Sequence, residues 1–273
     1  MRHIVDILIE ERATKLMKNP RIWSFVKTRL YPYLKYQEAK ELIDHVTAFG
    51  GKEIFDHLGK LLNLNLKATG LKNIPESGRA ILMPNHPSGI ADGVAVYEAI
   101  KSVRQDIKFF ANRDAVRCAP TLEDIIIPVE WMENRRDHTK SKETVKSMIQ
   151  AFKEEKLIVI FASGKLARPT PLGLIERPWL TSGVSLAQKF DCPIIPMHIK
   201  ATNSFLYYLF WFLNTETLAC KTTLNALSCI PIDVSLTNSG ISRSKTRKIR
   251  TIYMFSTNYK SSKTVTYTQH PAH

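Results

Sequence analysis

Apolar residues recur along this chain with two different periods, and the change from one to the other falls near residue 64. In the first part, apolar positions such as Ile4 and Leu8 return at helical spacing, with charged residues between them. The pattern predicts an N-terminal helical region over residues 1–60, in which Pro20 opens a second helix and Gly50-Gly51 ends a third. This region could cap the rest of the molecule or lie on a membrane as a platform, and the two roles are compatible.

From residue 64 onward, short apolar segments alternate with amphipathic ones. Strands are expected over residues 64–70, 78–84, 107–111, 123–128, 157–162 and 192–201. Helices are expected over residues 92–100, 142–155 and 181–190. Short strands separated by helices predict an α/β domain over residues 61–230, with a mixed, largely parallel sheet flanked by helices. In such a sheet, ligands bind at the carboxyl ends of the strands, where the loops carry the chemistry.

The last part of the chain, residues 231–273, differs in composition. It holds seven Lys or Arg residues against the single acid Asp233, together with fourteen Ser or Thr residues. Hydrophobic periodicity fades after the segment IPIDVSL, so a poorly ordered or atypical basic tail is expected. A C-terminus altered by a shift of reading frame is the alternative explanation.

The charge of the chain indicates an anionic partner. A formal net charge of +14 and a sequence pI near 9.6 suit either nucleic acid or an anionic membrane surface. No helix-turn-helix, RRM or zinc-finger signature occurs in the sequence, so nucleic acid is not expected as a partner.

No apolar run reaches the length of about 18 residues that spans a membrane. The acidic residues Asp6 and Glu10 do not suit a secretory signal. The cysteines form no C-x-x-C pair, so free thiols in a reducing compartment and no metal site are expected.

The segment NHPSGIAD, residues 85–92, stands between an expected strand and an expected helix. Gly89 lets the backbone turn back tightly between His86 and Asp92. Asp92 begins the helix, where the helix dipole favours a carboxylate. Asp92 could therefore only cap the helix, with His86 an ordinary loop residue, or it could also orient the imidazole of His86.

A histidine oriented by a carboxylate suits general-base catalysis on an alcohol. The imidazole takes a hydroxyl proton on one ring nitrogen while the carboxylate holds the other, which fixes the tautomer. The chain has no G-x-S-x-G nucleophile elbow, and Ser88 lies too close to His86 in the sequence for a triad serine. A His/Asp pair without a protein nucleophile predicts direct transfer from an activated donor to an acceptor hydroxyl.

These residues resemble the glycerolipid acyltransferases, which are lysophosphatidic-acid acyltransferase-like or PlsC-like enzymes. NHPSGIAD is similar to their N-H-x-x-x-x-D signature. FFANRDA resembles their second block, in which an arginine, here Arg113, faces the phosphate or head group of the acceptor. VIFASGKLAR stands in the place of their third block, F-P-E-G-T-R, and CPIIPMHI is similar to the fourth. The ordered set, over about residues 60 to 215, is more specific than any single block.

The third block departs from the family's pattern. Its glycine is kept as Gly164, but Ser163 stands in place of the glutamate, and Lys165 and Arg168 surround the position of the arginine. The missing acid makes the chain similar to the divergent bacterial branch that includes haemolysin-like and ornithine-lipid O-acyltransferases. It also leaves the identity of the acceptor open.

The resemblance implies a membrane-associated O-acyltransferase of membrane lipid synthesis, which moves a fatty acyl group from acyl-CoA or acyl-ACP to the hydroxyl of a lysolipid. The acceptor would be a lysophospholipid such as 1-acylglycerol-3-phosphate, or a lyso-ornithine lipid. His86 would be the base and Asp92 its orienting carboxylate. The acceptor-binding residues would be Arg113, Ser163, Gly164, Lys165 and Arg168. No metal or cofactor beyond the acyl donor is implied.

The resemblance also implies a peripheral or monotopic location on the cytoplasmic face of the inner membrane, with an anionic membrane surface as partner. A catalytically weak lipid-binding protein is the alternative, and a basic nucleic-acid-binding protein is a third hypothesis. The segment FLYYLFWFL, residues 205–213, is too short to span a bilayer. It could be a buried helix or an interfacial segment beside the site. His198, within an apolar strand, is expected to be structural.

Overall fold

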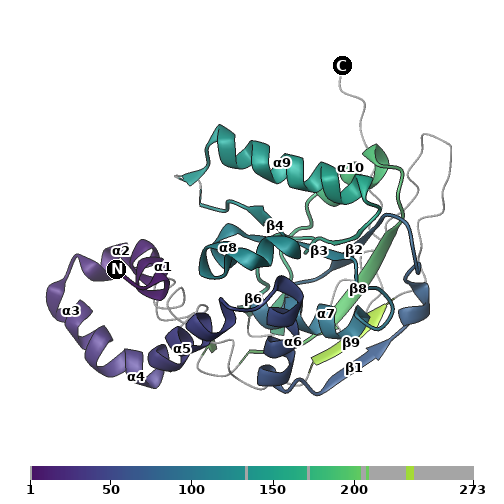
Figure 1. Ribbon diagram of the computed structural model, residues 1–273. Coiled ribbons are helices and arrows are strands. Elements are labelled where there is room, and N and C mark those ends of the chain that lie inside the picture. The colour runs from purple at the N-terminus through teal and green to yellow at the C-terminus, as the bar shows by residue number, and fades with distance from the viewer. Residues whose placement is uncertain (1, 133–134, 171–172, 204–206, 209–231, 237–273) are drawn as a thin grey trace.

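A sheet of seven strands forms the centre of the molecule (Figure 1). The structure, a computed structural model, describes residues 2–132, 135–170, 173–203, 207–208 and 232–236. The strands of the sheet are β1 (Leu66–Thr69), β2 (Ala80–Pro84), β3 (Ile107–Asn112), β4 (Ile126–Val129), β5 (Leu157–Val159), β8 (Ile194–Lys200) and β9 (Ile232–Leu236). They lie in the order β1-β9-β8-β2-β5-β3-β4, and every neighbouring pair is parallel except β8 and β9. The predicted mixed, largely parallel sheet is confirmed.

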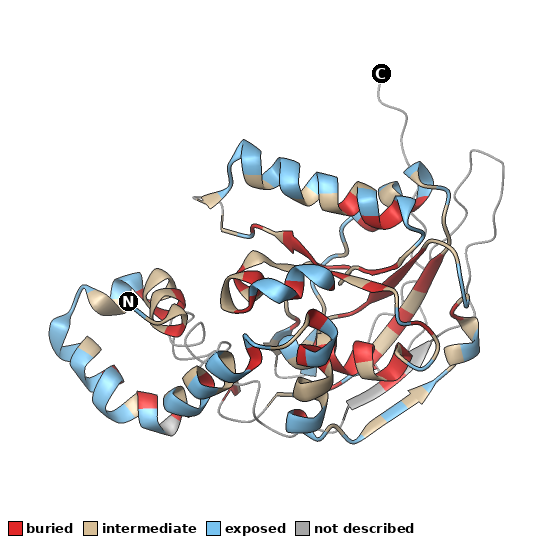
Figure 2. Cartoon of the chain, in the orientation of Figure 1, coloured by how far each residue is buried: buried red, intermediate tan, exposed pale blue. Residues whose placement is uncertain are grey.

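Helices cover both faces of this sheet. They are α6 (Gly51–Leu62), α7 (Ile90–Ile100), α8 (Arg113–Cys118), α9 (His138–Lys153) and α10 (Ser182–Lys189), with 3-10 turns at Leu71–Asn73 and Pro120–Asp124. In β2, Ala80 and Leu82 pack in the same core as α6 and α7, whereas Ile81 and Met83 pack on the other face with α9 and α10. All of β2 is buried, while the outer sides of the helices are exposed (Figure 2). A strand covered on both faces explains the continuous apolar run in the sequence.

The N-terminal helices form an arm that extends away from the sheet (Figure 1). They are α1 (Ile4–Arg12), α2 (Thr14–Met17), α3 (Pro20–Phe25), α4 (Tyr31–Tyr33) and α5 (Tyr36–Val46), with a π-helical turn at Val26–Leu30. The arm has a small core of its own, in which Val5 and Ile9 are buried with Val26. The helical periodicity of this part of the sequence therefore corresponds to real helices.

Gly50 and Gly51 begin a helix and do not end one. The preceding helix α5 ends at Val46, and α6 begins at Gly51. The side chain of Glu53 accepts a hydrogen bond of 2.9 Å from the N–H of Gly50, which satisfies a free donor at the start of α6. A Cβ atom on Gly51 would lie 2.8 Å from the carbonyl oxygen of Thr121. The expected helix end was wrong because Gly51 allows close packing at the start of α6.

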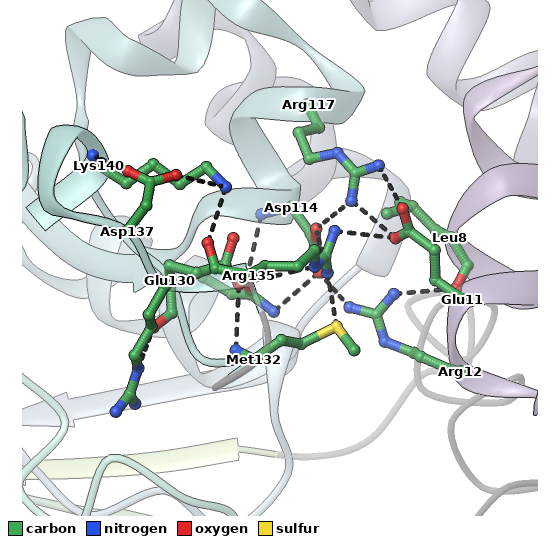
Figure 3. Close-up of polar contacts among 12 residues, drawn as sticks. Leu8, Glu11, Arg12, Asp114, Arg117, Glu130, Met132, Arg135, Asp137 and Lys140 are labelled. Carbon is green, nitrogen blue, oxygen red and sulfur yellow. Dashed lines mark hydrogen bonds and ion pairs between the residues drawn. The ribbon is translucent and has the colours of Figure 1, made fainter.

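Ion pairs fasten α1 to α8 and to the segment after β4 (Figure 3). Arg117 donates two hydrogen bonds of 2.8 Å to Glu11 and one of 2.8 Å to Asp114. Arg12 and Arg135 also pair with Asp114. Burial would raise the pKa of Asp114, but the hydrogen bond from Arg117 and the charges of Arg12 and Arg135 hold it below its usual value. The ionised carboxylate therefore stabilises this contact between the arm and the sheet domain.

The sheet includes a strand beyond the boundary expected at residue 230. β9 lies between β1 and β8, and its Val234 is 1% exposed. The basic composition that follows this strand concealed it, because only a short apolar alternation marks it in the sequence. The α/β domain therefore extends at least to residue 236, and the remainder of the expected tail, residues 237–273, lies outside the described residues.

Candidate active site

Three of the sequence motifs lie at one edge of the sheet. NHPSGIAD continues from the end of β2, NRDAVR begins at the last residue of β3, and SGKLAR follows β5. These three strands are neighbours and run parallel, so their carboxyl ends meet at the same edge. The structure thus brings together the loops in which the sequence places the site.

The side chains of His86 and Asp92 are in contact. Nδ1 of His86 lies 2.9 Å from Oδ2 of Asp92, which is fully buried in the first turn of α7. The same carboxylate accepts backbone N–H hydrogen bonds from Ser88 at 2.8 Å and Gly89 at 2.9 Å, and another from the Ser88 hydroxyl. Asp92 therefore caps α7 and also holds the imidazole. Because Nδ1 is engaged, Nε2 is the ring nitrogen left for a substrate proton.

The loop that joins these two residues depends on Gly89. Five residues separate His86 from Asp92, one more than in the N-H-x-x-x-x-D signature. Gly89 adopts φ 103° and ψ −129°, a conformation that residues with a side chain rarely adopt. In this conformation the loop folds back so that its own N–H groups reach the carboxylate of Asp92. The glycine therefore accommodates the longer spacing.

His86 is fixed by its neighbours through both its ring and its backbone. The ring stacks on Phe161 with centroids 4.1 Å apart and an interplanar angle of 29°. The backbone carbonyl accepts a hydrogen bond of 2.9 Å from Ala167. The backbone N–H donates one of 3.2 Å to the carboxyl group of Glu176. The side chain is 13% exposed, so the imidazole is held in place while part of it stays accessible.

The residues of the third block have different surroundings. Ser163 is buried, and its hydroxyl contacts the carbonyl oxygen of Lys165 and the carboxyl group of Glu176. Gly164 has φ 61°, in the left-handed region that glycine favours. Lys165 and Arg168 are exposed, and neither side chain forms an ion pair or hydrogen bond with the described residues. These two cations are therefore available to an anionic ligand, whereas Ser163 supports the turn.

Arg113 is engaged elsewhere. Its guanidinium forms an ion pair of 2.9 Å with Glu143 of α9 and donates a hydrogen bond of 3.3 Å to the carbonyl oxygen of Lys140. Within the described part of the chain, no hydrogen bond or ion pair joins it to His86 or to the third block. Its Nε atom is buried without a hydrogen-bond partner among the described residues. The role that the resemblance implies for Arg113 stays a prediction.

One residue of the site was missed in the sequence. Glu176 contacts His86 and Ser163, and it is the only acidic residue between Glu155 and Asp191. A single carboxylate in so long a stretch is the signal that could have singled it out. Tyr207 is also buried; burial raises its pKa to about 12, and the charge of Asp92 adds to this shift.

Tyr207 belongs to the apolar segment 205–213, of which the structure describes only residues 207–208. Tyr208 accepts a hydrogen bond of 2.8 Å from the backbone of Asn203 on its hydroxyl group. The choice between a buried helix and an interfacial segment therefore lies largely outside the described residues. Within the described residues, no helix has the length and apolar character needed to cross a membrane.

The described residues contain no group of three or more His, Cys, Asp or Glu side chains that could hold a metal ion. Cys118 and Cys192 are free thiols, and burial raises the pKa of each to about 11. Burial also lowers the pKa of His198, which favours its neutral form. Within the described residues, none of these groups forms a hydrogen bond or ion pair with His86 or Asp92, so the site is described by the loops above.

The sequence is similar to proteins of one known family. Residues 65–200 match the model of the Acyltransferase family. A lyso-glycine lipid O-acyltransferase of Phocaeicola vulgatus is 23% identical over 159 residues, which are 58% of this chain and 55% of that protein. A lyso-glycine lipid O-acyltransferase of Bacteroides thetaiotaomicron is 20% identical over 205 residues, which are 75% of this chain and 72% of that protein. The match thus spans little more than half the length of the first of these relatives.

Among solved structures, the 1-acyl-sn-glycerophosphate acyltransferase PlsC of Thermotoga maritima aligns with a TM-score of 0.42 and 14% identity, over 87% of this chain and 86% of that one. The family model defines the class of the protein as an acyltransferase. The chain belongs to the glycerolipid acyltransferase family that its motifs resemble.

Proposed function

We propose that the protein is a lysolipid O-acyltransferase in which His86 is the general base and Asp92 orients it. The contact of 2.9 Å between Nδ1 of His86 and Oδ2 of Asp92 carries this proposal. This contact leaves Nε2 of His86 free to accept a proton. Asp92 is fully buried, so its carboxylate is not exposed to solvent. Membership of the acyltransferase family supports the type of reaction.

The proposed reaction is a direct transfer. Nε2 of His86 accepts the proton of the lysolipid hydroxyl as its oxygen attacks the thioester carbonyl of acyl-CoA or acyl-ACP. The new C–O bond forms, the C–S bond breaks, and the departing thiolate takes the proton from the imidazolium. Asp92 stabilises that imidazolium through the hydrogen bond to Nδ1. The thioester is already activated, so the step needs no acyl-enzyme.

The acceptor in this proposal carries an anionic group that binds Lys165 and Arg168. Both are exposed and have no ion-pair partner among the described residues, and an arginine can hold a carboxylate or phosphate with two hydrogen bonds. Arg113 contributes only if its ion pair with Glu143 opens. The names of the curated relatives favour a lyso-glycine lipid as acceptor over 1-acylglycerol-3-phosphate, with a lyso-ornithine lipid as the related alternative.

The enzyme would reach its lipid from an anionic membrane surface, as a peripheral protein on the cytoplasmic face. The net charge of +14 supports this partner, since each Lys or Arg near an anionic surface contributes about 1 kcal/mol, screened by salt. Vesicle flotation provides the measurement. Flotation that persists unchanged with zwitterionic lipid or at high salt would contradict an electrostatic attachment.

Purified protein with acyl-CoA or acyl-ACP tests the activity. The acceptors are lyso-glycine lipid, lyso-ornithine lipid and 1-acylglycerol-3-phosphate, and the product is the acylated lipid, measured by mass spectrometry. We expect transfer by the wild-type protein and a loss of about 10²–10⁴-fold in the His86→Ala variant. Wild-type binding of lysolipid without any transfer would support the lipid-binding alternative. Transfer by His86→Ala at more than about a tenth of the wild-type rate would exclude His86 as the base.

A further inference from the structure

The carboxyl group of Glu176 joins two loops of the site. Its Oε2 atom accepts a hydrogen bond of 3.2 Å from the backbone N–H of His86, and its Oε1 atom lies 2.6 Å from the hydroxyl oxygen of Ser163. Glu176 directly follows strand β7 (Gly173–Ile175), which pairs antiparallel with β6 (Arg168–Thr170). The chain leaves the third-block turn through β6 and comes back through β7. Glu176, the next residue, therefore lies beside Ser163 of that turn.

The hydrogen bonds around Ser163 indicate which partner of this contact donates. The hydroxyl oxygen of Ser163 lies 2.6 Å from the carbonyl oxygen of Lys165 as well as 2.6 Å from Oε1 of Glu176. A serine hydroxyl has one proton to donate, and a carbonyl oxygen can only accept. Both contacts are satisfied when Ser163 donates to Lys165 and the carboxyl group of Glu176, in its protonated form, donates to Ser163.

The surroundings of Glu176 agree with this assignment. Burial raises the pKa of its carboxyl group, and the nearby negative charge of Asp92 raises it further, against the opposing effects of Ser163 and His86. The backbone N–H of His86 is satisfied in either protonation state, because it needs only an acceptor. The neutral acid therefore fits the geometry and the electrostatics together.

We propose that Glu176 is a positioning residue of the acyl-transfer site, which links the His86 loop to the Ser163–Lys165 turn and stands in for the acidic residue that the third block lacks. The proposal rests on the proposed function, because it concerns the placement of the proposed base. The backbone N–H of Ala167, two residues after this turn, donates a hydrogen bond to the carbonyl oxygen of His86. With Glu176 on the N–H, both polar backbone groups of His86 are held by the segment that also carries the exposed Lys165.

The exchange of Glu176 for glutamine or alanine separates this role from others. In Glu176→Gln, the amide oxygen accepts from His86 and the amide NH₂ group donates to Ser163, which is the pattern of the protonated acid. In Glu176→Ala, both links are lost. We expect Glu176→Gln to keep at least about half of the wild-type kcat, and Glu176→Ala to lose kcat on the order of 10- to 100-fold through misplacement of the base.

Two controls accompany these variants. Glu154→Ala removes an exposed acid at the end of α9 and should leave kcat and the melting temperature unchanged. Ser163→Ala combined with Glu176→Ala should be no slower than Glu176→Ala alone, because the two residues act through one contact. If Glu176→Ala unfolds, Glu176→Gln is compared with Glu176→Asp instead. The shorter acid cannot reach both partners, so kcat should fall in Glu176→Asp and be kept in Glu176→Gln.

Three outcomes would overturn the proposal: wild-type kinetics in Glu176→Ala, equal loss in the glutamine and alanine variants, or additive losses in the double variant. A loss in Glu176→Ala that glutamine restores, at an unchanged melting temperature, supports it. Failure of the proposed function would show in the wild-type protein itself, as an absence of transfer to every lysolipid. Failure of the positioning role would show only in the Glu176 variants of an active enzyme.

Discussion

The side-chain amide of Asn85 exchanges two hydrogen bonds with the backbone of Ile199, one of 2.9 Å from its NH₂ group to the carbonyl oxygen and one of 2.6 Å from the N–H of Ile199 to its carbonyl oxygen. Asn85 thus continues the pairing of β2 with β8 by one position after the backbone of β2 has ended. The next residue is His86, so this pair sets the point at which the site loop leaves the sheet.

Replacing Asn85 by alanine should lower both stability and activity. The substitution leaves the polar groups of Ile199 buried without partners, at a cost of about 1–3 kcal/mol. It also frees the start of the His86 loop, so kcat should fall more than the KM of the lysolipid rises. Thermal unfolding and steady-state kinetics measure the two effects. An Asn85→Ala protein with a wild-type melting temperature would show that the hydrogen bonds to Ile199 are not needed.

Asp92→Asn should slow acyl transfer strongly. An amide in this position cannot accept all the hydrogen bonds that the carboxylate receives, and it cannot stabilise the imidazolium of His86 as a charge does. We expect kcat to fall on the order of 10²-fold or more. Asp191→Asn is the matched control, because Asp191 is exposed and has φ 47°, a conformation that asparagine tolerates. A slow Asp191→Asn variant would mean that the assay reports general damage.

The sequence predicts where the strands lie along the chain better than it predicts which strands are neighbours in the sheet. Apolar runs such as residues 80–83 must be covered on both faces, so their character as buried strands follows from local pattern. The strand order depends on contacts between distant parts of the chain, which no local pattern records. β9 escaped prediction for this reason, because its pairing with β1 and β8 outweighs the basic composition that follows it.

In the candidate site, too, contacts between residues close in the sequence could be predicted, and contacts between distant residues could not. His86 and Asp92 could be paired from the sequence because Asp92 follows His86 by only six positions and Gly89 closes the loop between them. Glu176 could not, because the hydrogen bond to His86 joins residues ninety positions apart. Arg113 was assigned to the acceptor from the resemblance of FFANRDA to the family's second block, and its ion pair with Glu143 depends on how α9 packs, which the sequence does not record.

Lys165→Ala and Arg168→Ala should weaken binding of the acceptor. Both cations are exposed beside the site, so their loss removes attraction for an anionic group without disturbing the core. The KM of the lysolipid should rise by about 5- to 50-fold, corresponding to about 1–2 kcal/mol, while the KM of the thioester donor changes less. Lys146→Ala on the exposed side of α9 is the control for loss of one positive charge. An effect on the donor alone would assign these two cations to the wrong substrate.

The contact between the arm and the sheet domain should weaken in acid. Asp114 and Glu11 have pKa values below their ordinary range in the folded protein, so their ion pairs contribute stability above the unfolded pKa of about 4 and lose it as the pH falls through the lowered values. Hydrogen exchange of α1 should therefore accelerate as the pH is lowered below about 4, after correction for the intrinsic rate.

Asp114→Asn should produce a similar loosening at neutral pH. The variant leaves Arg12, Arg117 and Arg135 without their shared carboxylate, which should cost about 3 kcal/mol. Its remaining stability should depend less on pH than that of the wild type between neutral and acid conditions. A wild-type pH dependence in Asp114→Asn would show that other groups govern the acid response.

Two truncations test how far the folded domain extends toward the C-terminus. A chain that ends at residue 239 keeps β9, whereas a chain that ends at residue 231 removes it. In the described sheet β1 pairs only with β9, and Val234 of β9 is buried in the core, so the shorter chain loses a strand, the pairing of β1 and core contacts. Its melting temperature should fall by about 10 °C or more, while the longer chain should stay within about 3 °C of the full protein. Val234→Asp in the full chain is the companion variant, since it places an unpaired charge in the core without shortening the chain. Equal melting temperatures of the two truncated chains would show that β9 contributes nothing to the stability of the sheet.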